Sequence, residues 1–126
     1  MGTWIMIIIT YILIPALMTG AGWMIWKNPP KTINAMYGYR TRMSSLNQNT
    51  WQFSQEYAGR LWVRWGIRMM LVSILLLMFC AAAGEKAAST AGSVLCIVQT
   101  IIMLSSIAIV ERMLNKVFDK QGNLKK

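Results

Sequence analysis

The side chains best suited to chemistry lie in one polar stretch, "NAMYGYRTRMSSLNQNTW", which runs from Asn34 to Trp51. An arginine there can give charge-assisted hydrogen bonds to a phosphate. A turn at Gly38 would add main-chain N–H groups, because glycine adopts positive φ at little cost. The candidate loop residues are Asn34, Tyr37, Gly38, Tyr39, Arg40, Thr41, Ser44 and Trp51. The secondary basic contacts are Arg42, Arg60 and Arg64.

The same stretch offers little for catalysis. General acid–base chemistry needs positioned titratable groups, yet the chain has no histidine and Glu56 is the only acidic residue nearby. Cys80 and Cys96 lie far from the stretch in sequence and are expected to be free thiols, although a disulfide between neighbouring helices stays open. We therefore expect a protein that is not an enzyme and that holds no metal or other cofactor.

The rest of the chain is apolar. Its 126 residues are 56% hydrophobic and 13% charged, whereas a soluble domain has about 25% charged residues. The net charge of +9 could indicate a nucleic-acid partner, but the basic residues lie between and after apolar segments. We therefore expect one membrane domain, residues 1–126, with no nucleic-acid partner and with basic contacts to anionic lipid headgroups.

Three apolar segments, at about residues 3–26, 65–84 and 89–110, reach the roughly 20 residues that a membrane-spanning helix needs. Pro15 is expected to kink the first helix, which neighbouring helices can tolerate in lipid. Small residues crowd the "GEKAAS" turn and would let the second and third helices approach closely. The predicted fold class is an all-α membrane protein with three transmembrane helices.

The distribution of Lys and Arg predicts the orientation. These residues are concentrated in segment 27–64 and in a basic tail, 111–126, whereas the Gly84–Ser89 turn contains only Lys86. We therefore expect the loop and the C-terminus to be cytoplasmic and the N-terminus to lie outside.

Segment 27–64 is predicted to form a structured loop followed by an interfacial helix, which continues straight or by a bend into the second span. Asn49 with Gln52 resembles a capping box, and Glu56 with Arg60 is a favourable i,i+4 pair. Aromatic rings and arginines also collect at membrane interfaces simply as anchors. Anchoring does not account for a glycine turn flanked by hydroxyl groups.

The stretch "INAMYGYRTRMSSLNQNTWQFSQEYAGRLW" resembles the signature loop of the SdpI family of small bacterial membrane proteins. That signature has an Asn, a Gly-centred core ending in Arg-Thr, a Ser, a later Trp and a Gly. The matching positions are Asn34, Gly38, Tyr39, Arg40, Thr41, Ser44, Trp51 and Gly59. This chain has Gln55 where the family often has Asn or His.

The resemblance implies an immunity protein of the bacterial plasma membrane that resists a secreted antimicrobial peptide toxin. It also implies a signalling role, in which a cytoplasmic repressor is held at the membrane and Arg40 is the central donor of the loop. The alternative is a binder of anionic lipid headgroups or a small carrier. Three spans are too few for a usual transport pathway, so a carrier would require a homo-oligomer.

Overall fold

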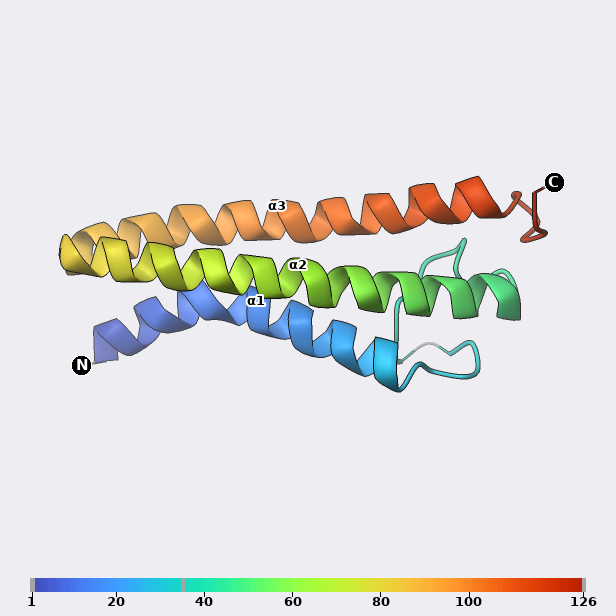
Figure 1. The fold of residues 1–126 in the computed structure, drawn as a ribbon, viewed down its shortest axis with the longest axis horizontal. Helices are drawn as coiled ribbons and strands as arrows, with labels where there is room; N and C mark the ends of the chain where they lie inside the picture. The colour runs from blue at the N-terminus through green and yellow to red at the C-terminus, as the bar shows by residue number, and fades with distance from the viewer. Residues whose placement is uncertain (1, 35, 126) are drawn as a thin grey trace.

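The computed structural model describes residues 2–34 and 36–125 and consists of three long helices. They are α1 (Gly2–Lys27), α2 (Gln48–Ala82) and α3 (Glu85–Val117). Figure 1 shows the helices side by side, with the N-terminus and the α2–α3 turn at one end of the bundle. The α1–α2 loop and the C-terminal tail lie at the other end, here called the loop end.

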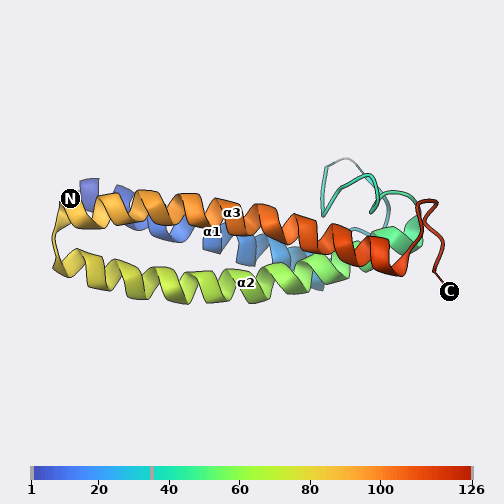
Figure 2. The same cartoon turned by 90° about the horizontal axis from the view of Figure 1, so that it is seen from above.

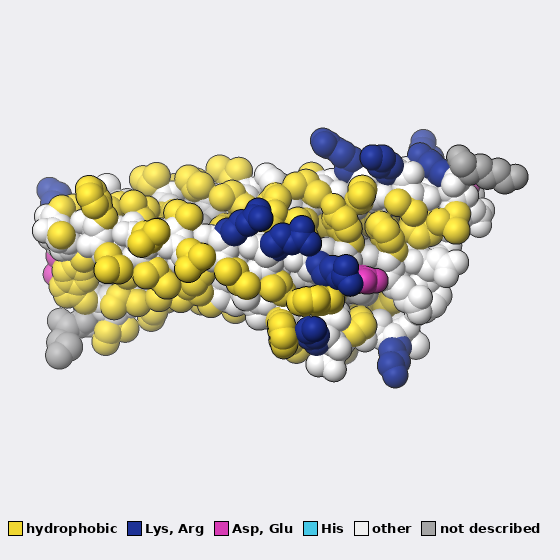
Figure 3. Space-filling model, in the orientation of Figure 1, with side chains coloured by type: hydrophobic (Ala, Val, Ile, Leu, Met, Phe, Trp, Pro, Cys, Tyr) yellow, Lys and Arg dark blue, Asp and Glu magenta, His cyan; other side chains and the backbone are white. Residues whose placement is uncertain are grey.

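The predicted all-α fold with three spans is confirmed. All three helices are long and apolar enough to cross a membrane, and no strand occurs among the described residues apart from one isolated bridge between Phe118 and Leu124. Large apolar side chains such as Leu17, Leu75 and Phe79 are exposed on the bundle surface, and apolar groups cover much of the face seen in Figure 3. A bilayer would cover these side chains.

The second helix is continuous from the loop end to the turn. The residues predicted to form an interfacial helix and the second span are both part of α2, Gln48–Ala82. Figure 1 shows this helix as one unbroken ribbon, and in Figure 2 its loop-end part passes behind α3. The predicted capping box is wrong by two residues, because the N-cap is Asn47. Its side chain accepts a 2.9 Å hydrogen bond from Thr50 N–H, and Thr50 Oγ1 accepts one of 3.0 Å from Asn47 N–H. Threonine at the third helical position replaces the predicted glutamine.

Glycines bring α1 and α2 into backbone contact. A Cβ on Gly59 would lie 2.8 Å from Trp26 N, and one on Gly22 would lie 2.8 Å from Gly59 O. Near the α2–α3 turn, a Cβ on Gly92 of α3 would lie 2.7 Å from the ring of Tyr11 in α1. Small residues thus allow close helix packing without a strong hydrophobic drive, and α1 takes part in each of these contacts.

One polar junction joins all three helices at mid-span. Pro15 has no N–H to donate to the carbonyl of Tyr11 four residues earlier, and Figure 1 shows α1 bending part of the way along. Gln99 of α3 donates to that Tyr11 carbonyl at 3.2 Å and to Ser73 Oγ of α2 at 2.7 Å. The Tyr11 carbonyl that Pro15 leaves without a helical donor is therefore satisfied by a side chain of α3.

The last described residues fold back onto the loop end. Phe118 is buried, and Asp119 Oδ1 accepts hydrogen bonds from the backbone of Gln121 and Asn123. Asn47 Nδ2 donates to Gly122 O at 2.7 Å, which ties the tail to the N-cap of α2. Lys126, counted in the predicted basic tail, lies outside the described residues.

Candidate functional site

The centre of the loop is Tyr39, which a glutamine of α2 holds by its backbone. Gln55 Oε1 accepts from Tyr39 N–H at 2.7 Å, and Gln55 Nε2 donates to Tyr39 O at 2.6 Å. Gln55 is fully buried, so these two bonds satisfy polar groups that water does not reach. Gly38 makes the approach feasible, because it has φ +101° and a Cβ there would lie 2.6 Å from Gln55 Oε1.

The side chain of Tyr39 reaches the third helix. Its hydroxyl donates to Glu111 Oε1 at 2.7 Å, and its ring contacts that of Trp62 edge-on at 6.1 Å. Burial, followed by the hydrogen bond to Glu111, raises the pKa of Tyr39 well above its ordinary value. The hydroxyl therefore stays protonated and remains a donor. Through one residue, the loop contacts both α2 and α3.

The start of the candidate loop is held by local turns. Asn34 Oδ1 accepts from the backbone N–H groups of Met36 and Tyr37 at 2.9 and 2.8 Å, which is an Asx-type turn. The Tyr37 hydroxyl donates to Asn28 O at 2.9 Å. These two predicted site residues thus shape the backbone that leads to Gly38.

Thr41 and Ser44 cap a short turn by exchanging hydrogen bonds. Thr41 N–H donates to Ser44 Oγ at 2.8 Å, and Ser44 N–H donates to Thr41 Oγ1 at 3.2 Å. Ser44 is fully buried, and its carbonyl accepts from Thr50 Oγ1 at 3.1 Å. The two hydroxyl residues connect Tyr39 to the first turn of α2.

Trp51 anchors the segment that follows α1. Its indole Nε1 donates to Pro30 O at 2.7 Å, and its ring is fully buried. A neighbouring glutamine, Gln48, donates to Lys31 O. An interface anchor would keep its ring in the headgroup region, whereas Trp51 is enclosed by protein.

The predicted basic residues lie on the surface around this core. Arg40, Arg42, Arg60 and Arg64 are all exposed. Arg60 pairs with Glu56 at 2.8 Å and lies over the ring of Trp26 at 5.8 Å. Figure 3 shows Lys and Arg gathered on the half of the molecule nearest the loop end. The structure therefore separates the candidate set into a neutral core of buried and half-buried residues and an exposed basic rim.

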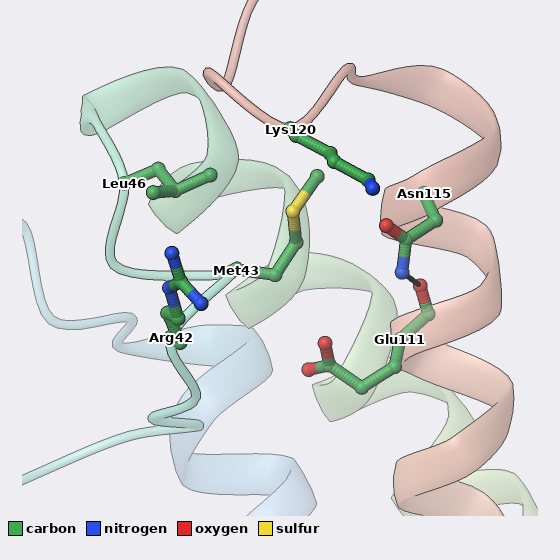
Figure 4. A pocket seen from close by; sticks show the side chains of 6 residues that line it. All are labelled: Arg42, Met43, Leu46, Glu111, Asn115 and Lys120. Carbon is green, nitrogen blue, oxygen red and sulfur yellow. Dashed lines mark hydrogen bonds between the residues drawn. The ribbon is translucent and has the colours of Figure 1, made fainter.

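A cavity of about 360 Å³ opens between the loop and the end of α3. Figure 4 shows its walls: Arg42, Met43 and Leu46 from the loop, Glu111 and Asn115 from α3, and Lys120 from the tail. Two cations and one carboxylate border it, and the carboxylate is the group that accepts from Tyr39. The arrangement can receive a small anionic group beside the Tyr39–Glu111 contact.

Two residues central to this arrangement, Gln55 and Glu111, were not among the predicted site residues. The sequence does contain a signal for Gln55, because Trp51, Ala58 and Gly59 lie three or four residues away on the same helical face. The structure buries all three of these neighbours. Glu111 carries no such signal in the sequence. Among the described residues, no group of three His, Cys, Asp or Glu side chains could hold a metal ion.

The comparisons with known proteins concern the same part of the chain. Residues 31–110 match the model of the SdpI/YfhL protein family, a range that contains most of the α1–α2 loop, all of α2 and most of α3. A 60-residue stretch is 40% identical to the protein named "Uncharacterized protein YfhL" of Bacillus subtilis (strain 168). It covers 48% of this chain and 54% of that protein, so the match spans about half of the relative's length.

No solved structure matches the chain. The family match covers well over half of the sequence, and the loop within the matched range is hydrogen-bonded to both α2 and α3. The chain therefore belongs to the SdpI/YfhL protein family and is a multi-pass membrane protein.

Proposed function

We propose that the protein gives resistance to a secreted antimicrobial peptide toxin, with the bundle engaging the peptide and the loop reporting the state of the bundle. The observation that carries the proposal is the position of Tyr39. Its backbone is fixed to Gln55 of α2 and its hydroxyl to Glu111 of α3. A peptide that shifted α3 relative to α2 in the membrane would strain this contact.

In this proposal the loop end is cytoplasmic and the N-terminus lies outside. The support is the positive-inside rule, because the segments at the loop end hold most of the Lys and Arg while the α2–α3 turn holds Lys86. A cytoplasmic repressor could then contact the exposed rim that includes Arg40 and Arg42. The test is labelling of single cysteines with an impermeant maleimide, in a variant without Cys80 and Cys96. Ser89→Cys should label from outside intact cells, whereas Asn123→Cys should label only after lysis.

The resistance test uses two tyrosines that each lose only a hydroxyl. A sensitive bacterial host would express wild type, Tyr39→Phe or Tyr37→Phe at equal membrane levels, and survival against hydrophobic peptide toxins would be measured. Tyr39→Phe removes the bond to α3, and Tyr37→Phe removes a bond to Asn28 within the loop. We expect wild type and Tyr37→Phe to protect and Tyr39→Phe to lose most of the protection. Equal protection by both variants would refute the coupling, and no protection by wild type would refute resistance itself.

The same assay tests Arg40, which the family signature marks as the central charged residue. Arg40→Ala should lose protection while the protein is still inserted, and Arg112→Ala, an exposed arginine on α3, is the matched control. Protection retained by Arg40→Ala would remove Arg40 from the mechanism.

A second candidate function, binding of anionic lipid headgroups, is favoured by the cavity that Arg42 and Lys120 border. Native mass spectrometry of the protein with phosphatidylglycerol or phosphatidylcholine would test it. We expect retention of the anionic lipid by wild type and its loss in the Arg42→Gln/Lys120→Gln variant. Equal retention of the two lipids would count against this function.

A further inference from the structure

Three arginines follow one face of α2 from the loop end into its apolar part. Arg60, Arg64 and Arg68 are spaced four residues apart and are all exposed, so successive members are separated by a helical rise of roughly 6 Å. We call them the arginine row. Figure 3 shows basic side chains extending from the loop end into the apolar surface of the bundle. The row therefore carries positive charge toward the part of α2 that lies in the membrane.

The inner end of the arginine row lies at the level of the lipid chains. Arg68 lines a cavity of about 380 Å³ with Ile102 and Ser105 of α3, and both of these residues belong to an uncharged run, residues 87–110. On α2, residues 69–82 between Arg68 and the turn span only about 21 Å, whereas a hydrocarbon core is about 30 Å thick. A bilayer that α2 crosses therefore surrounds Arg68 with lipid chains.

The chain itself supplies no anion for the inner two arginines. Its acidic residues are Glu56, Glu85, Glu111 and Asp119. Glu85 lies at the α2–α3 turn and the others lie at the loop end. Among the described residues the only ion pair joins Arg60 to Glu56, so Arg64 and Arg68 have no acidic partner there. A second copy in the same orientation would bring its acidic residues at the same depths. Because a charge within a span is costly without a counter-charge, we expect the anion to come from another molecule.

The direction of α2 gives this face the polarity of a phospholipid. Side chains lean toward the N-terminus of their helix, which for α2 is the loop end, so the long side chains of Arg64 and Arg68 can reach toward the headgroups. Beyond Arg68 the same helical face carries the exposed apolar side chains of Val72, Leu75 and Phe79. Phosphates at the arginines and acyl chains along this apolar face would lie in the order that a lipid of the loop-end leaflet presents them.

Two guanidinium groups one helical turn apart fit a lipid with two phosphates. A lipid with one phosphate neutralises one arginine and leaves the other charged within the membrane, which is costly. Cardiolipin has two phosphates joined by a short glycerol bridge, and once the first phosphate is bound the second binds intramolecularly. We propose that Arg64 and Arg68 bind one cardiolipin, each pairing with one phosphate, while the acyl chains lie along the apolar face of α2 beyond Arg68.

The first experiment compares lipids. Wild-type protein in a neutral detergent would be titrated with cardiolipin, phosphatidylglycerol or phosphatidylcholine, with matched acyl chains and equal total phosphate, and native mass spectrometry would give the apparent Kd. We expect one cardiolipin per chain, bound about tenfold more tightly than phosphatidylglycerol, because the second phosphate adds a charge-assisted contact. Phosphatidylcholine should bind most weakly. Equal affinity for cardiolipin and phosphatidylglycerol would overturn the proposal.

The second experiment separates this site from the loop-end cavity that Arg42 and Lys120 border. The Arg42→Gln/Lys120→Gln variant should keep the wild-type preference for cardiolipin over phosphatidylglycerol. Loss of the preference in this variant would assign cardiolipin to the loop-end cavity and overturn the proposal. The proposal does not rest on toxin resistance, since lipid affinity is measured without a toxin.

The third experiment removes each arginine in turn. Arg64→Gln and Arg68→Gln should each lower the affinity for cardiolipin about tenfold, to that for phosphatidylglycerol, because one phosphate loses its partner. Arg112→Gln, which changes an exposed arginine of α3 outside the arginine row, should leave the preference unchanged. An equal loss in Arg112→Gln would show that only general positive charge matters and would overturn the site.

Discussion

The loop end and the membrane bundle are stabilised in different ways. At the loop end, buried Ser44, Thr50 and Gln55 each form hydrogen bonds with the backbone of another residue. In the bundle, α1 and α2 meet through glycines, and the polar junction at Gln99 joins the three helices. The loop thus depends on matched donors and acceptors, whereas the bundle depends on the absence of side-chain bulk.

The difference reflects the surroundings of each part. Lipid gives helices little hydrophobic reason to associate, so close backbone packing decides their contact. A loop outside the membrane competes with water for every polar group, so it needs dense internal pairing to hold one shape. Substitutions that add bulk should therefore damage the bundle most, and substitutions that remove a polar partner should damage the loop.

Adding bulk at Gly59 should have the largest effect. Gly59→Leu places atoms against the backbone of Trp26 in α1, where even a Cβ would lie 2.8 Å from the nitrogen. We expect a loss of about 3 kcal/mol or more in the free energy of unfolding, measured by denaturation in detergent micelles. Gly20→Leu is the control, since a Cβ there meets nothing within 4 Å. Equal loss in both variants would contradict glycine-mediated packing.

Removing the glutamine partner should unfold the loop but leave the bundle intact. Gln55→Leu leaves the buried N–H and C=O of Tyr39 without their partner, at a cost of about 2–3 kcal/mol. Limited trypsin digestion should then cut after Arg40 and Arg42 much faster, while helical content in circular dichroism stays near that of wild type. Unchanged digestion would show that the loop is held by other contacts. Gln52→Leu, at an exposed position of the same helix, is the control.

A comparison of two glycines with positive φ distinguishes the cost of backbone strain from the cost of crowding by neighbouring atoms. Gly38 has φ +101° and contacts at 2.6 Å and 2.7 Å for an added Cβ, whereas Gly84 has φ +113° and nothing within 4 Å. Gly84→Ala should cost about 1 kcal/mol or more from backbone strain, because φ +113° with ψ 169° is a region that essentially only glycine adopts. Gly38→Ala should cost about 2 kcal/mol or more, from strain plus the clash with Gln55. The comparison is made by thermal unfolding. Equal losses of stability in the two variants would mean that the loop around Gly38 shifts to make room for the added methyl group.

Tyr39→Phe should cost about 1 kcal/mol, the value of a typical hydrogen bond. The raised pKa of Tyr39 adds a pH dependence. Its contribution to stability is fully present below the ordinary value of 10.0 and declines above it, because the unfolded chain ionises there while the folded chain does not. Unfolding measured from pH 9 to 11 should show a smaller decline in Tyr39→Phe than in Tyr37→Phe. An identical decline would contradict the burial of the Tyr39 hydroxyl.

The smallest effect is expected at the surface ion pair. The side chains of Arg60 and Glu56 are 54% and 62% exposed, and such pairs contribute about 0.5 kcal/mol or less. The free energy of unfolding of the Arg60→Gln variant should therefore lie within about 0.5 kcal/mol of the wild-type value. A larger loss, abolished by adding Trp26→Leu to the variant, would instead assign the stabilisation to the contact with the Trp26 ring.

The spans could be predicted because long apolar runs depend only on local composition. The loop residues could be singled out for the same reason, since Gly38, Thr41, Ser44 and Trp51 differ from the apolar chain around them. The cap at Asn47 was missed because two asparagines stand close together there, and only the backbone conformation decides between them.

The contact between Tyr39 and Glu111 could not be predicted. The two residues are 72 positions apart in sequence, and their meeting depends on how α3 crosses α2. Exposure alternates from Tyr39 (buried) to Arg40 (exposed), Thr41 (half-buried) and Arg42 (exposed). This alternation directs the arginines outward, a detail that composition alone does not reveal.

The junction at Pro15 also has a consequence for synthesis of the chain. The first span enters the membrane with the Tyr11 carbonyl lacking its usual helical donor, and the side chain that satisfies it belongs to Gln99, which is made 88 residues later. Lipid offers no substitute donor. The first helix therefore completes its hydrogen bonding only after the third helix has been translated and inserted, so a ribosome must deliver nearly the whole protein before its first segment is fully stable.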